Sequence, residues 1–119
     1  MKLSIIVPAY NEEATICNVL ERLKSIELIA GFEKEVIVVN DCSRDNTETN
    51  VLSYLNENKN FDVKYFKHDI NQGKGAALHT GIAKASGDFV IVQDADLEYD
   101  PQEFNLLLKP VVDGVADVV

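Results

Sequence analysis

The chain has 119 residues, 46% of them hydrophobic and 26% charged. It is therefore long enough to bury one core, and its composition excludes a disordered or fibrous protein. Its 20 acidic residues outnumber its 11 basic ones, and the net charge of -9 argues against binding to nucleic acid or to an anionic membrane surface. A small phosphorylated ligand remains compatible, because a divalent cation, backbone amides or one lysine can neutralise a phosphate locally.

The cysteines and the apolar segments indicate where the chain resides. Cys17 and Cys42 lack metal-ligand spacing, and the chain enters a strand-like segment directly after Met1-Lys2, without a secretory leader. Since no apolar run approaches the ~20 residues that span a bilayer, we expect a soluble chain in a reduced, cytoplasmic setting.

Apolar segments of two periodicities alternate along the chain. Strands are predicted, from residue composition and spacing, at 3–7, 36–39, 61–66 and 89–92. Helical spacing occurs at 16–26, 52–55 and 75–85. This alternation predicts an α/β fold with a Rossmann-like parallel sheet, helices on both of its faces and right-handed crossovers.

Helix starts are predicted from capping residues. Asn11 is placed to cap the first helix, and Asp45 with Glu48 has the spacing of a capping box. A further helix is predicted from Asp100, Pro101 and Glu103. Segment 115–119 resembles the start of one more strand, and we expect the 119 residues to be the N-terminal part of a longer protein.

Polar residues follow each predicted strand, at segments 8–12, 40–45, 68–75 and 93–100. In open parallel sheets, ligands bind beyond the carboxyl ends of the strands. The sharpest of these segments places Asp94 and Asp96 around a small alanine, with Glu98 following. Such oxygen ligands suit Mg²⁺ or Mn²⁺ bridging a diphosphate. The alternative is an acidic loop that caps the next helix.

Single residues at the other strand ends each allow two interpretations. Asp41 is either an acceptor for the imide or amide edge of a nucleobase or a turn residue. Lys74 lies between two glycines, outside any P-loop spacing, and either approaches a phosphate or ribose or is a solvated loop residue. Tyr10 either stacks on a base or is a half-buried aromatic. We assign no role to His68 or His79, since a lone histidine is more often structural.

Four motifs in order resemble family 2 of the inverting glycosyltransferases, which have a GT-A fold, and within it the polyprenyl- and dolichyl-phosphate hexosyltransferases. They are Ile-Ile-Val-Pro-Ala-Tyr-Asn-Glu (5–12), Val-Asn-Asp-Cys-Ser-Arg-Asp-Asn-Thr (39–47), Asn-Gln-Gly-Lys-Gly (71–75) and Asp-Ala-Asp-Leu-Glu (94–98). The resemblance covers nearly the whole chain. It departs from the family in the second motif, where Asn40 stands for an Asp and Cys42 for a Gly.

The resemblance implies a site for each part of the donor. The implied nucleotide contacts are Pro8, Ala9, Tyr10, Glu12, Asp41, Lys74, Asp94 and Ala95. Asp96 would ligate Mg²⁺ or Mn²⁺ together with Asp94 and with Glu98, which stands where relatives often carry Gln. Residues 1–119 would be the donor-binding part, and acceptor contacts and catalytic residues are expected beyond Val119.

The implied function is metal-dependent, inverting transfer of a hexose from a UDP- or GDP-sugar to a lipid-phosphate acceptor such as a polyprenyl phosphate, or to a saccharide. The full-length protein would then work at the cytoplasmic face of a membrane. Two alternatives remain: a nucleotide-binding module without transfer activity, and a receiver-like signalling domain, which has a similar length and acidic strand ends. A dehydrogenase is disfavoured because no Gly-x-Gly-x-x-Gly follows the first strand.

Overall fold

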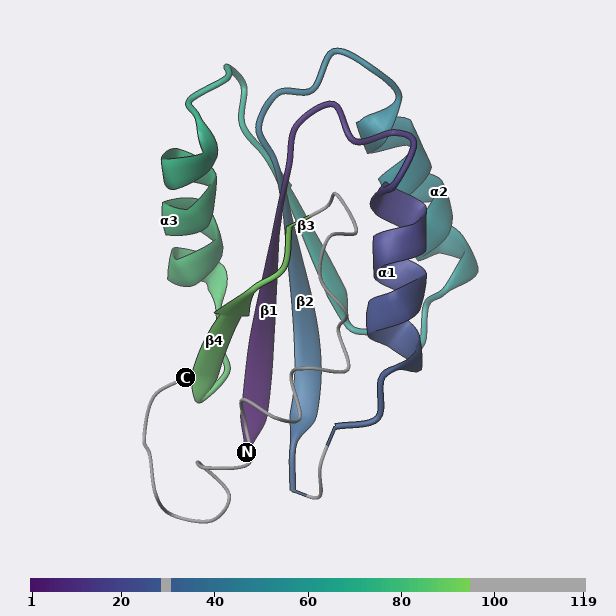
Figure 1. The fold of residues 1–119 in the computed structure, drawn as a ribbon, viewed down its shortest axis with the longest axis vertical. Coiled ribbons are helices and arrows are strands. Elements are labelled where there is room, and N and C mark those ends of the chain that lie inside the picture. The colour runs from purple at the N-terminus through teal and green to yellow at the C-terminus, as the bar shows by residue number, and fades with distance from the viewer. Residues whose placement is uncertain (29–30, 95–119) are drawn as a thin grey trace.

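The computed structural model describes residues 1–28 and 31–94 as alternating strands and helices (Figure 1). In chain order the elements are β1 (Lys2–Ala9), α1 (Ile16–Ser25), β2 (Glu33–Asn40), α2 (Thr47–Glu57), β3 (Val63–Lys67), α3 (Lys74–Lys84) and β4 (Phe89–Val92). The predicted elements are present, with bounds that differ by a few residues. The helix and strand predicted after residue 94 lie outside the described residues.

The strands form one parallel sheet in the order β3-β2-β1-β4. Along β1 and β2 the register runs from Lys2 opposite Glu33 to Ala9 opposite Asn40. Both central strands are apolar on both faces, which is the pattern of a parallel strand covered by helices. The carboxyl ends of all four strands therefore lie at one edge of the sheet.

The helices cover the two faces unequally: α1 and α2 lie on one face, and α3 lies on the other (Figure 1). On the first face, alternate residues of β1 and β2 pack against Ile16, Val19, Leu20 and Leu23 of α1 and Val51 and Tyr54 of α2. On the second face, Ile37 and Val39 pack against Ala77 of α3. Within residues 1–28 and 31–94, none of the helices combines the length and apolar character needed to cross a bilayer.

Helix α3 approaches the sheet closely at Gly81. A Cβ atom added to this glycine would lie 2.5 Å from Cγ2 of Ile6, which is fully buried in β1. No carbon atoms approach each other so closely without displacement. The missing side chain therefore sets the distance between α3 and the sheet.

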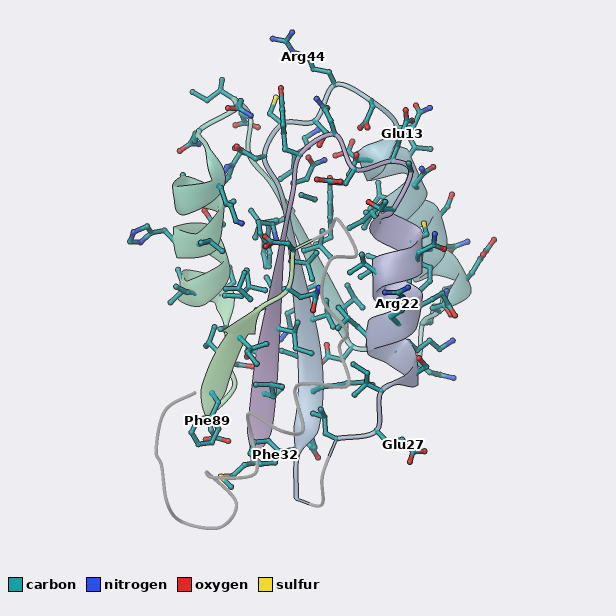
Figure 2. All side chains as sticks on the ribbon, in the orientation of Figure 1. Glu13, Arg22, Glu27, Phe32, Arg44 and Phe89 are labelled. Carbon is teal, nitrogen blue, oxygen red and sulfur yellow. The ribbon has the colours of Figure 1, made fainter. Side chains whose placement is uncertain are left out.

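The amino end of the sheet holds a buried carboxylate, Glu35, whose side chain has no exposure to solvent. It accepts hydrogen bonds from Ser4 Oγ (2.5 Å), Ser86 N (2.7 Å) and Ser86 Oγ (2.9 Å), and an ion pair from Lys64. At the same end, the rings of Phe32 and Phe89 lie 5.9 Å apart (Figure 2). Burial raises the pKa of Glu35, but the donors outweigh burial and lower its pKa to about 2.

Candidate functional site

A pocket of about 400 Å³ opens at the carboxyl end of the sheet. It lies between the segments that follow β1, β2 and β4 and the amino-terminal turn of α3. Its lining residues are Pro8, Ala9, Tyr10, Glu12, Asp41, Asn71, Gly73, Lys74, Ala77 and Asp94. The pocket therefore lies where ligands bind in open parallel sheets.

Asp41 occupies the inner wall of this pocket, directly after β2, and is 3% exposed. Its Oδ1 accepts hydrogen bonds from Gln72 N and from the His68 ring, and its Oδ2 accepts one from Gly73 N, each at 2.8 Å. Burial raises the pKa of Asp41, but these donors together lower it below its ordinary value of 3.8. The carboxylate is therefore ionised at neutral pH and aligned by the loop that leads into α3.

The segment after β1 is held in place by the segment after β2. Three successive amides, at residues 11 to 13, donate hydrogen bonds to side chains of the second segment. The bonds are Asn11 N to Ser43 Oγ (2.9 Å), Glu12 N to Thr47 Oγ1 (2.9 Å) and Glu13 N to Asp45 Oδ2 (3.2 Å). The donation is reciprocal, because Arg44 N donates to Asn11 Oδ1 at 2.8 Å. In Figure 2, Glu13 and Arg44 mark these segments, at the end of the sheet opposite Phe32 and Phe89.

Both predicted helix caps in these segments are wrong. Helix α1 begins at Ile16 after Thr15, and Asn11 lies four residues earlier with a φ of 53°. Helix α2 begins at Thr47 after Asn46, without the capping box. The reason is that other partners are available to these side chains: Asn11 accepts from the opposite segment, and the Asp45 carboxylate accepts from two amides at once, one through each oxygen.

The competing partners lie in the neighbouring segments. Asn11 accepts from the other loop, as described above. Asp45 Oδ1 accepts from Thr47 N at 2.9 Å, and Glu48 accepts from the Tyr65 hydroxyl of β3 at 2.8 Å. Assignment of Asp45 to a structural role is confirmed, although by different bonds from those predicted.

Cys42 adopts the left-handed backbone conformation, with a φ of 59°. This conformation favours glycine, because a Cβ atom crowds the following carbonyl. The position is the one at which the resemblance predicted a glycine. The backbone of this chain therefore takes a conformation that favours glycine although it carries a cysteine, and the Cys42 thiol donates a long bond to Asp69 O at 3.4 Å.

Lys74 begins α3 and pairs with Asp94, the second residue after β4. Their Nζ and Oδ1 atoms lie 2.6 Å apart, and the side chains are 60% and 28% exposed. The pair places one cation and one carboxylate on the wall of the pocket, beside the amides of the first turn of α3. The ammonium of Lys74 has the charge to bind a phosphate, and the carboxylate of Asp94 has the charge to bind a metal ion.

Only one of the three predicted metal ligands lies within the described residues. Asp94 lies in the pocket, whereas Ala95, Asp96 and Glu98 lie outside residues 1–28 and 31–94. Among the residues within those ranges, no three acidic, histidine or cysteine side chains gather as a metal site. Asp94 fits as one hard oxygen ligand facing the pocket, and the remaining predicted ligands stay a prediction.

Seven of the eight predicted nucleotide contacts line the one pocket, and the eighth is Ala95. Three further residues of the lining were not singled out: Asn71, Gly73 and Ala77. The first two belong to the motif at 71–75, and Ala77 follows Gly73 by one helical turn. The contact of His68 with Asp41 was also missed, because it joins residues 27 positions apart without any local signal.

Strand order β3-β2-β1-β4, with a pocket at the carboxyl ends of the strands, defines an open parallel α/β sheet whose ligand site lies at that end. The model of glycosyl transferase family 2 matches residues 4–119, so the chain belongs to this family. A dolichyl-phosphate β-glucosyltransferase of Trichomonas vaginalis is 37% identical over 114 residues, covering 92% of this chain and 35% of that protein.

Two solved structures share the fold. S. aureus TarS in complex with UDP-GlcNAc has a TM-score of 0.75 and 32% identity, over 96% of this chain and 32% of that chain. The mannosyltransferase PcManGT of Pyrobaculum calidifontis, in complex with GDP-Man and Mn²⁺, has a TM-score of 0.74 and 26% identity, over 85% and 29% of the two chains. The predicted GT-A fold class is thus confirmed, and the receiver-like alternative is wrong. The chain spans about a third of the length of these relatives.

Proposed function

We propose that residues 1–119 form the donor-binding part of a glycosyltransferase that moves a hexose, with inversion, from a UDP- or GDP-sugar. The observation that carries the proposal is the gathering of Tyr10, Asp41, Lys74 and Asp94 around one pocket. These side chains come from four separate segments, and each offers chemistry that one part of a nucleotide-sugar requires. Relatives crystallised with UDP-GlcNAc and with GDP-Man support the same class of donor.

In this proposal the nucleoside occupies the inner end of the pocket. Asp41 accepts a hydrogen bond from a base N–H, because its Oδ2 accepts from Gly73 N and a carboxylate oxygen accepts two such bonds. Tyr10 is 42% exposed and offers a ring face for stacking. Lys74 and the first amides of α3 approach the phosphates. Both UDP and GDP present a suitable N–H, so the choice of base stays open.

We further propose that Asp96, with Asp94 and Glu98, holds Mg²⁺ or Mn²⁺. When bound, such an ion stabilises the negative charge left on the nucleoside diphosphate as the sugar departs. Support comes from the sequence pattern, from the position of Asp94 in the pocket and from the Mn²⁺ complex of the Pyrobaculum calidifontis mannosyltransferase. Lys74 lies 2.6 Å from Asp94 and contributes a second positive charge to the same region.

The acceptor in the proposal is a lipid phosphate such as a polyprenyl phosphate, or a saccharide, presented at the cytoplasmic face of a membrane. Similarity to a dolichyl-phosphate β-glucosyltransferase supports the lipid phosphate. An ionised phosphate needs little help from a base, whereas a hydroxyl acceptor requires a carboxylate to remove its proton. Residues that contact the acceptor are expected beyond Val119.

Calorimetric titration of UDP and of GDP, each with and without Mn²⁺, tests the donor site. We expect metal-dependent binding of one nucleotide and at least tenfold weaker binding by Asp41→Asn, because a hydrogen bond to a charged acceptor is lost. Asp62→Asn is the matched control, since Asp62 is exposed at the other end of β3. Absence of metal-dependent binding by either nucleotide would overturn the proposal.

A second candidate is nucleotide binding without transfer by the 119 residues themselves. It is favoured by the chain's coverage of about a third of its relatives. Donor hydrolysis and transfer, assayed with the radiolabelled UDP- or GDP-sugar, separate the two candidates. Turnover by the 119-residue chain would exclude the binding-only function.

A further inference from the structure

The ring of His68 joins the nucleotide pocket to the middle of α3. His68 directly follows β3, is 9% exposed and reaches α3 at Thr80. Its Nδ1 lies 2.8 Å from Asp41 Oδ1, and its Nε2 lies 2.7 Å from Thr80 Oγ1. Both ring nitrogens thus have protein partners, and neither faces solvent as an isolated group.

The two contacts determine how the ring is protonated. An ionised carboxylate only accepts hydrogen bonds, so Nδ1 carries a proton and donates it to Asp41. In the neutral ring, Nε2 then accepts from the Thr80 hydroxyl, which is able to donate. This assignment fixes both the tautomer and the orientation of the imidazole.

Asp41 is consequently held from two directions. The amides of Gln72 and Gly73 approach from the loop that enters α3, and the His68 ring approaches from the end of β3. Without the ring, Oδ1 would keep only the bond from Gln72 N. The carboxylate would then be free to rotate toward the loop and away from the pocket.

We infer that His68 is a positioning residue for nucleotide recognition: it orients the Asp41 carboxylate toward the base and couples that orientation to α3. This inference rests on the proposed donor site. His68 does not line the pocket, so it acts through Asp41 and through the placement of the Gly73–Lys74 turn. The role requires a donor at the position of Nδ1 specifically.

Two substitutions of His68 distinguish a need for a hydrogen-bond donor at the position of Nδ1 from a purely structural role of the side chain. In His68→Asn the amide nitrogen takes the place of Nδ1 and retains the donor to Asp41, whereas in His68→Gln it takes the place of Nε2 and faces Thr80. Titrations of UDP and GDP with Mg²⁺, together with thermal unfolding, are made on both variants. His79→Gln is the matched control, because His79 is exposed on the same helix beside Thr80.

We expect His68→Gln to raise the nucleotide Kd about tenfold and His68→Asn to stay within about threefold of the unsubstituted protein. Equal affinities of the two variants, whether unchanged or equally reduced, would overturn the inference even if both melt at lower temperature. Absence of binding by the unsubstituted protein is a different result, which overturns the donor site itself.

A measurement on the unsubstituted protein decides the case if a variant fails to fold. Long-range ¹H–¹⁵N correlation spectra report which ring nitrogen carries the proton. We expect His68 to show a protonated Nδ1 and both nitrogen resonances to shift as UDP or GDP saturates the protein. A ring protonated only at Nε2, or ring nitrogen resonances that do not shift when the nucleotide binds, would overturn the inference.

Discussion

Glu35 and Ser4 meet inside the sheet, where the serine hydroxyl donates a hydrogen bond of 2.5 Å to a carboxylate without solvent exposure. Lys64 and Ser86 complete the environment of this carboxylate. One charged residue of β2 thereby connects β1, β3 and the turn before β4. The region is remote from the pocket, so its contribution is to stability.

Stability should fall in acid because of Glu35. Its folded pKa of about 2 lies below the ordinary 4.5, so its contribution is complete above about pH 5 and is lost as the pH falls toward 2. The loss is on the order of 3 kcal/mol, since each unit of pKa difference corresponds to about 1.4 kcal/mol. Urea unfolding between pH 2 and 7 measures it.

The matched variants for this prediction are Glu35→Gln and Glu33→Gln. The first should be less stable at pH 7 and should flatten the acid-dependent part of the profile. The second changes an exposed residue of the same strand and should leave the profile intact. A profile for Glu35→Gln that is parallel to that of the unsubstituted protein would contradict the assignment.

Gly81→Ala should destabilise the protein despite the helical preference for alanine. The new Cβ would lie 2.5 Å from Ile6 Cγ2, and such overpacking costs roughly 1–3 kcal/mol, more than the ~1 kcal/mol gained from helix propensity. Gly75→Ala, in the first turn of the same helix, has open space and should be neutral or stabilising. Chemical denaturation compares the two, and equal effects would argue against the close approach of α3.

Cys42→Gly should stabilise the fold by about 0.5–1 kcal/mol, because it removes the cost of a left-handed non-glycine residue and loses only a long thiol bond. Cys17→Ala is the comparison for loss of a thiol. Cys17 lies in a regular helix, so this change should give no comparable gain. Unfolding measured under reducing conditions should show the difference, and a loss of stability in Cys42→Gly would refute the argument.

Thr47→Val should weaken nucleotide binding as well as stability. The hydroxyl is buried, accepts from Glu12 N at 2.9 Å and donates to Asp45, so valine removes one hydrogen bond from each of these groups at a cost of about 1–3 kcal/mol. Glu12 lines the pocket, and we expect the UDP or GDP affinity to fall several-fold. Thr49→Val changes an exposed residue of the same helix and should alter neither quantity.

The sequence predicted the parallel sheet and its polar edge because both follow from local patterns. Continuous apolar runs identified the central strands, and the polar residues after them identified the pocket. Only Ala95 among the predicted nucleotide contacts, and Asp96 and Glu98 among the predicted metal ligands, lie outside the described residues. The roles of all the predicted site residues stay predictions.

Other features depend on contacts between distant residues and were not predictable in this way. Asn11 and Asp45 are residue types that often cap helices, but Asn11 accepts from Arg44 N and Asp45 accepts from Glu13 N, in each case across to the opposite segment. Glu35 lies just outside the strand predicted at 36–39, and its burial depends on Ser4 and Lys64, which only the strand order brings near. His68 likewise acquires its role only once β2, β3 and α3 are assembled.

The hydrogen bonds between segments 11–13 and 43–47 hold these two stretches together as one structural unit. The three donors are backbone amides, which almost any residue at positions 11–13 would supply, whereas the acceptors are the side chains of Ser43, Asp45 and Thr47. A change of side chain in the segment 43–47 would therefore alter the wall of the pocket to which Glu12 belongs, although about thirty residues of chain separate the two segments.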